Sequence, residues 1–254
     1  MPLPVDVKEL MRSGTRLVEE RERPVRVAVF VEVDADDGLI SAVQTALRPR
    51  TAAASLQVEL AEPDTQITLA AATDVVVAVA GMGGAGLRQA LDVPRRALVP
   101  VVTVAIGDET SAGVLADSLA HPTADLLVAA DAAEAIERLG AWLADALGSK
   151  RLALAHNFAF MRRAVATDAV KTTAWQNGLV GAVSLIPGAD MPIMTANQAK
   201  MLLQIAAVYG ESLGADRIKE LAAVVGGGFL FRALARQALV VVPVLGWAVK
   251  GGIA

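Results

Sequence analysis

The chain has 254 residues, of which 54% are hydrophobic and only 20% charged, and its mean hydropathy is +0.49. It contains no cysteine and only two histidines, which excludes thiolate catalysis, disulfides, cysteine-ligated metals and histidine-rich zinc sites. This length and composition predict two domains that together are more apolar than a typical soluble protein.

Charge is divided unevenly along the chain. Residues 149–254 carry 11 Lys/Arg and 5 Asp/Glu, a net charge of +6, which leaves 12 and 22, a net charge of −10, for residues 1–148. The asymmetry predicts an acidic soluble part and a basic, apolar part that faces anionic lipid or an acidic partner. Nucleic acid is a poor partner because the basic half lacks clustered basic and aromatic residues. The first residues lack an apolar core of signal-peptide length, so we expect the chain to start in the cytoplasm.

Residues 5–22 predict a charged lead-in helix, and apolar strands then alternate with helical segments. The strands are apolar on both faces, which is typical of a parallel sheet covered by helices on each side. We therefore expect an α/β, doubly wound domain over residues 24–148, after a lead-in over residues 1–23. The expected strands are Val25–Val31, Leu56–Leu60, Val75–Ala80, Val99–Ile106 and Leu126–Ala130, and the expected helices are Gly38–Leu47, Leu87–Leu91, Ser111–Leu119 and Ala132–Leu147.

The first strand ends in acids where a phosphate-binding loop has glycines, a lysine and a hydroxyl. The segment reads Glu32-Val33-Asp34-Ala35-Asp36-Asp37-Gly38. Four carboxylates repel a nucleotide, so we expect this loop to leave the phosphate site empty. A solvated loop that caps the next helix is the favoured interpretation, and a metal cluster is the alternative.

A glycine-rich loop follows the third strand. Gly81, Gly83 and Gly86 form a G-x-G-x-x-G pattern before an apolar helix, and Asp108 lies near the spacing of a ribose-binding acid. The pattern follows a middle strand, and Pro94 interrupts the next helix, so we favour a plain tight turn. The alternative is a nucleotide-binding switch or enzyme that uses this loop and Asp108.

The order of strands and helices from Asp74 to Leu147 resembles the second half of a small GTPase domain. In that family the acid after the penultimate strand belongs to an Asn-Lys-x-Asp motif that recognises guanine. Here the four positions read Ala105-Ile106-Gly107-Asp108, the P-loop is missing, and no Asp-x-x-Gly follows Leu60. The resemblance, over residues 25–147, implies a degenerate GTPase-like or Rossmann-like domain without nucleotide or any other cofactor.

From Lys150 the chain becomes helical and basic. Leu154, Phe158, Met161 and Val165 recur at helical spacing, which predicts a narrow apolar stripe. Basic residues before an apolar segment are typical of the cytoplasmic side of a membrane, and an amphipathic core helix is the alternative. The basic residues are Lys150, Arg151, Arg162, Arg163 and Lys171.

The stretch from Ala174 to Ala207 is strongly apolar, and Asp190 is the only ionisable residue between Asn177 and Asn197. Prolines break it twice, and a Thr-x-x-Gln capping box predicts a helix that starts after Thr195. We expect a helical hairpin with Asp190 capping the turn at its tip. The structural or partner-binding residues of this hairpin are Pro187, Gly188, Asp190, Pro192, Thr195, Asn197 and Gln198.

Five motifs carry a resemblance in the C-terminal part: residues 185–192, residues 195–201, the glycine triplet at 226–228, residues 232–237 and residues 246–250. With them, residues 149–254 resemble the YcjF-like family, a bacterial domain of unknown function that accompanies GTPases and is described as membrane-embedded. The resemblance implies an all-α, apolar, membrane-associated domain over residues 149–254.

Neither apolar segment is a clean membrane span, because a spanning helix needs about 20 apolar residues. Gly178–Ala196 contains two prolines and an acid, and Ala238–Val249 has only 12 residues before Lys250. Shallow or re-entrant hairpins fit better. We therefore expect a non-catalytic interaction or scaffold protein at the cell membrane, with its N-terminal domain in the cytoplasm and a protein partner or second copy bound. No Ser/His/Asp or paired-carboxylate arrangement indicates a hydrolase.

Overall fold

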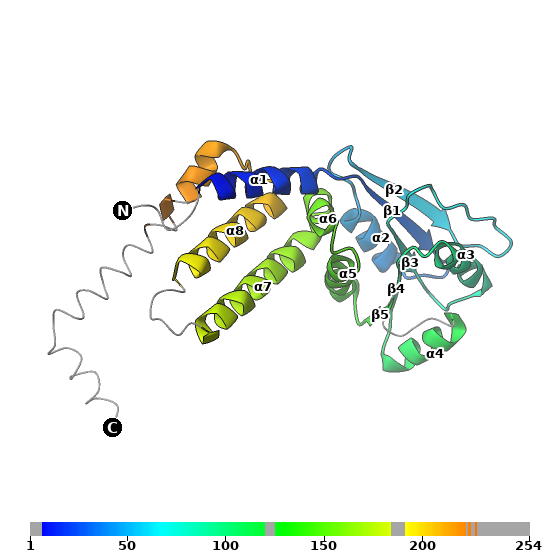
Figure 1. Ribbon diagram of the computed structural model, residues 1–254. Helices are drawn as coiled ribbons and strands as arrows, with labels where there is room; N and C mark the ends of the chain where they lie inside the picture. Colours follow the sequence, from blue (N-terminus) through cyan, green and yellow to red (C-terminus); the bar gives the residue numbers. More distant parts are fainter. Residues whose placement is uncertain (1–6, 120–124, 184–190, 222, 225–226, 228–254) are drawn as a thin grey trace, which may run out of the picture. The chain divides into compact units, whose positions relative to one another are not determined.

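Figure 1 shows the computed structural model, which describes residues 7–119, 125–183, 191–221, 223–224 and 227. The chain forms two compact units. Residues 18–168 with 207–210 make up one, here called the sheet unit, and the described parts of 1–17, 169–206 and 211–254 make up the other, here called the hairpin unit. The sequence divides the chain into domains at 1–23, 24–148 and 149–254. This division into domains stays a prediction.

The sheet unit is built on five parallel strands in the order β2-β1-β3-β4-β5. Their apolar runs of valine, alanine and leucine suit strands that are covered on both faces, and every residue of β3 is buried. The predicted α/β class is therefore confirmed. The strands are β1 (Val25–Val31), β2 (Ala54–Leu60), β3 (Val75–Val79), β4 (Val101–Ile106) and β5 (Leu126–Ala129).

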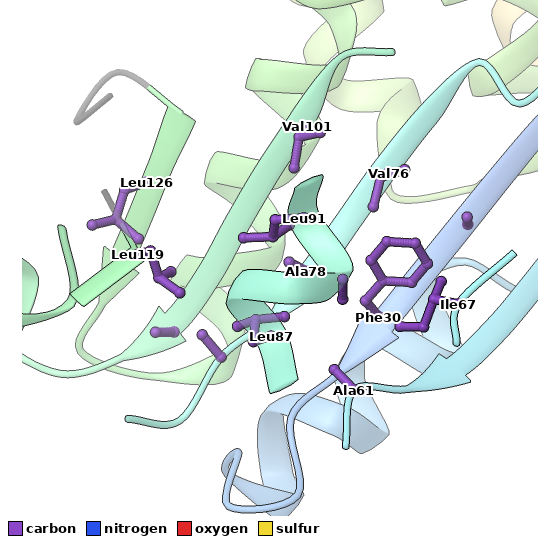
Figure 2. Close-up of a cluster of buried hydrophobic side chains, with 14 of the residues drawn as sticks. Phe30, Ala61, Ile67, Val76, Ala78, Leu87, Leu91, Val101, Leu119 and Leu126 are labelled. Carbon is purple, nitrogen blue, oxygen red and sulfur yellow. The ribbon is translucent and has the colours of Figure 1, made fainter. Parts of the chain in front are cut away.

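Helices cover both faces of this sheet. Side chains of α3 (Ala85–Arg96) and α4 (Glu109–Leu119) enclose Phe30 and its strand neighbours in one apolar cluster, shown in Figure 2. On the opposite face α2 (Asp37–Ala46) packs over β1 and contacts α5 (Ala132–Ala146). Residues that alternate along each strand therefore serve two separate cores, which is the arrangement of a doubly wound fold.

Helix α3 is longer than the sequence predicts. The expected helix ended at Leu91, whereas the observed helix continues through Pro94 to Arg96. Pro94 lies in the last turn and is buried, so its missing N–H costs one helical hydrogen bond near an end that frays in any case.

The predicted apolar stripe after Lys150 is buried, although it is divided between two helices. Leu154 lies in α6 (Arg151–Asn157), and Met161 and Val165 lie in α7 (Met161–Val183). Phe158 lies in the break between the helices and is also fully buried. The helical spacing therefore identified core residues correctly, although the helix is interrupted between them at residues 158–160.

The hairpin unit contains the first part of α1 (Val7–Arg21), most of α7 and most of α8 (Met191–Tyr209), followed by a helical segment at residues 215–221. In α1, Leu10 is buried, so the charged lead-in helix packs against the rest of its unit. Across the residues that the structure describes, no helix has the length and apolar character needed to cross a membrane.

Candidate functional site

The order of the strands places the carboxyl ends of β1 and β3 side by side, where doubly wound sheets have their ligand crevice. The connection from β1 leads to β2 on one side, and the following strand β3 pairs with β1 on the other side. Ligands of doubly wound sheets bind at such a reversal point. The acidic loop after β1 and the glycine-rich loop after β3 therefore meet where this fold class binds its ligands.

The carboxylate of Glu32 occupies this crevice. The backbone N–H groups of Gly81 and Gly83 donate to Glu32 Oε2 at 2.8 and 3.0 Å, and that of Gly84 donates to Oε1. The N–H of Met82 donates to Asp34 Oδ2 at 3.3 Å. Four successive amides thus point at carboxylates of the neighbouring loop, in the way that such amides cradle phosphate in nucleotide sites.

The glycines of the pattern bring the chain close to itself. A Cβ atom on Gly81 would lie 2.5 Å from the backbone oxygen of Asp34, and one on Gly86 would collide with the carbonyl oxygen of Ala61 beyond β2. Any side chain at these two positions would force the acidic loop and the β2 end away. The G-x-G-x-x-G pattern therefore has a sufficient explanation in the packing of three strand ends.

Of the two predictions about the acidic loop, one is wrong and the other is confirmed. Glu32 is only 5% exposed, so the expected solvated loop is wrong at this residue. Asp36 does cap α2 as expected, because its Oδ1 accepts a hydrogen bond from the Leu39 N–H at 2.8 Å. Within the described part of the chain, no group of three acidic or histidine side chains gathers in a way that would hold a metal ion.

Asp108 caps a helix. Its Oδ1 accepts from both the backbone N–H of Ser111, at 2.9 Å, and the Ser111 hydroxyl, at 2.8 Å, at the start of α4. These two hydrogen bonds, the backbone one first, lower the pKa of the Asp108 carboxyl. The residue that the sequence offered as a ribose ligand thus has a complete role in starting α4.

The role of Glu32 was missed because it depends on which strands are neighbours. The acidic and glycine-rich loops lie about fifty residues apart in the chain, and each was interpreted alone. Had the order β2-β1-β3 been assumed, an acid directly after β1 would have been expected opposite four amides directly after β3.

The predicted capping box of the apolar hairpin is wrong. Helix α8 begins at Met191, so Thr195 and Gln198 lie inside it and Thr195 is buried. The reason is Pro192, which was taken as a breaker but fits the first turn of a helix, where no N–H partner is needed. Asn197 is placed inward, and its Nδ2 donates to Asn177 Oδ1 at 3.0 Å. Pro187, Gly188 and Asp190 lie outside the described residues.

The α7–α8 pair buries polar as well as apolar residues. Thr173, Asn177 and Thr195 are buried, as are Val165, Leu203 and Val208. Some large apolar side chains of the same helices are exposed: Trp175 by 76%, Leu179 by 56% and Ile193 by 53%. In water the burial of apolar surface stabilises a fold, and these three exposed side chains contribute little to that burial.

Comparison with known families bears on the same helices. Residues 151–239 match the model of a family described as "Domain of unknown function (DUF697)". This segment is similar to that family. The match covers α6, α7 and α8, so the predicted resemblance of the C-terminal part is confirmed, while the GTPase likeness of residues 25–147 stays a prediction. No curated protein and no solved structure matches the chain.

Proposed function

We propose that the protein is a membrane-associated interaction or scaffold protein whose sheet unit presents a binding surface without turning over nucleotide. In this function the DUF697 helices attach the chain to lipid at the cytoplasmic face. The degenerate GTPase-like domain then serves as a fixed platform for a protein partner or a second copy.

The observation that carries the proposal is the exposed apolar side chains of the α7–α8 pair, together with the polar contact between its helices. Asn197 donates a hydrogen bond to Asn177, and hydrogen bonds between helices are typical of helices that associate in lipid. Trp175, exposed on the outside, is a residue type that membrane interfaces favour.

The non-catalytic part of the proposal is supported by Glu32. A phosphate group would need the amides of Gly81, Gly83 and Gly84, which already donate to the Glu32 carboxylate. It would also lie near the carboxylate of Asp34, which accepts from the N–H of Met82 between these glycines. Repulsion between neighbouring anions is strong where they are partly shielded from water. The nucleotide-switch alternative therefore requires the chain to expel its own carboxylate first.

Sedimentation tests the membrane part. The full chain should sediment with vesicles and resist carbonate extraction, and Leu179→Ser should weaken both. Val114→Ser is a matched control, because Val114 is exposed by 57%, as much as Leu179, but lies on α4 in the sheet unit. Equal behaviour of the two variants would overturn the assignment of α7–α8 as the lipid-facing surface.

Equilibrium binding tests the non-catalytic part. Labelled GTP, ATP and NAD should fail to bind the full chain at micromolar concentrations. Saturable micromolar binding of any of them, lost on Asp108→Ala or on substitution of Gly83, would support the nucleotide-switch alternative and remove this part of the proposal.

A further inference from the structure

A buried hydrogen bond in the sheet unit places two basic residues close together. The Thr51 hydroxyl donates to Asn157 Oδ1 at 2.7 Å, and Asn157, which is fully buried, donates from Nδ2 to the carbonyl oxygen of Ala153 in its own helix. Arg50 directly precedes Thr51, and His156 directly precedes Asn157. The loop after α2 is therefore fixed to α6, and Arg50 lies close enough to His156 for its charge to act on the imidazole.

A second arginine reaches the same place from α7. Arg162 donates from Nε to the carbonyl oxygen of Ala155 at 3.4 Å, and its guanidinium carbon lies 5.8 Å from the centre of the Tyr209 ring. Next to Tyr209, Gly210 packs against His156: a Cβ atom on Gly210 would lie 3.6 Å from His156 Nδ1. That nitrogen is buried and has no hydrogen-bond partner within the described residues.

Several positive charges and one carboxylate, that of Glu22, act on His156. Burial first, and then the charges of Arg21, Arg162 and Arg50, lower the pKa of His156, while Glu22 alone acts in the opposite direction. Burial and the charge of Arg50 also lower the pKa of Arg162. Among the described residues neither Arg50 nor Arg162 has a carboxylate ion-pair partner, whereas the neighbouring Arg163 pairs with Glu137 at 3.3 Å.

We propose that Arg50 and Arg162, with the charge of Arg21 behind them and Tyr209 beside them, form a binding site for a phosphoryl group. Like charges that are held together without a counter-ion raise the free energy of the folded chain, and an anion bound between them removes that cost. A planar guanidinium binds phosphate through two parallel hydrogen bonds, and within the described residues no hydrogen bond occupies the donors of Arg50.

The shared chemistry has two sources, a free phosphate compound and the headgroup of an anionic phospholipid. His156 and Arg162 belong both to the sheet unit and to the first residues of the DUF697 match. Binding of either ligand would therefore involve residues of that match. The residues of this phosphoryl site differ from the exposed apolar residues of α7–α8, so either can bind its ligand without the other.

The test uses the full chain and two probes, inorganic phosphate and vesicles of phosphatidylglycerol, with phosphatidylcholine vesicles as the neutral reference. Nuclear magnetic resonance follows the imidazole signals of His156. A bound anion offsets the arginine charges, so it should raise the pKa of His156. Arg50→Ala and Arg162→Ala should each weaken binding about tenfold or more, because each removes charge-assisted hydrogen bonds.

Arg163→Ala is the matched control, because it removes the same charge one residue away from Arg162 and should change affinity less than about twofold. Arg50 is exposed, so Arg50→Ala keeps the test valid if Arg162→Ala fails to fold. Phosphate binding alone would assign a soluble ligand, and selective vesicle binding alone would assign a lipid headgroup. Binding in neither arm, or an equal loss in Arg163→Ala, would overturn the proposal.

Discussion

The centre of the sheet unit and the contact between α7 and α8 differ in the residues that make them. In the sheet unit β3 buries five consecutive apolar residues, and the polar side chains of its loops bond to backbone or cap helices. In the α7–α8 pair an asparagine from each helix forms a hydrogen bond to the other, while Trp175 and Leu179 are exposed. The centre of the sheet unit therefore has the composition of a core that folds in water, and we propose that an apolar neighbour covers the exposed side chains of the helix pair.

The largest expected effect on stability is that of a substitution at Phe30, in the core of the sheet unit. Phe30→Ala should lower the free energy of unfolding by about 3–5 kcal/mol, because the ring is fully buried among α3 side chains and leaves a cavity (Figure 2). Denaturant unfolding followed by circular dichroism measures it. Leu179→Ala, which also truncates a large apolar residue, should stay within about 0.5 kcal/mol. Similar losses in both variants would break the contrast.

The next effect concerns the crevice. Glu32→Ala leaves three amide groups without their partner and should cost about 1–3 kcal/mol. The emptied loop should also gain affinity for inorganic phosphate or sulfate, which calorimetry can detect. Asp37→Ala, an equal loss of charge at an exposed residue five positions on, is the control. A variant as stable as the parent protein, with no gain in anion binding, would contradict the role given to Glu32.

How far the sequence predicted this fold differs between the two regions for a physical reason. All five strands and the four helices that flank them were expected within a few residues, because burial on both faces imposes continuous apolar runs. The bond between Glu32 and the glycine loop escaped prediction, since it depends on strand order rather than on local pattern. Sequence spacing alone therefore offered Gly81, Gly83, Gly86 and Asp108 as a nucleotide site.

The structure of the hairpin was harder to predict because a proline can either end or begin a helix. Pro192 ends a helix when it lies inside one and begins a helix when it lies in the first turn, and the chain uses the second option. Thr195 and Gln198 have the spacing of a capping box, but the helix was already formed before them. The predicted cap at Asp190 falls outside the described residues and stays a prediction.

The smallest stability effect tests the polar contact of the helix pair. Asn177→Ala should cost about 0.5–1.5 kcal/mol, because it removes the hydrogen bond to Asn197. A double-mutant cycle with Asn197→Ala isolates the coupling between the two side chains. Thr172→Ala, at an exposed position on the same helix, should be neutral. A coupling energy of zero would mean that the buried amides do not hold the pair together.

The central claim, that the outer surface of α7–α8 meets lipid, is tested most directly at Trp175. The chain has three tryptophans, so Trp142→Phe and Trp247→Phe leave Trp175 as the only tryptophan emitter. On addition of phosphatidylglycerol vesicles, its emission should shift to the blue and be quenched by brominated lipid, because an indole exposed by 76% leaves water. Unchanged emission that remains open to quenching by aqueous iodide would contradict the claim.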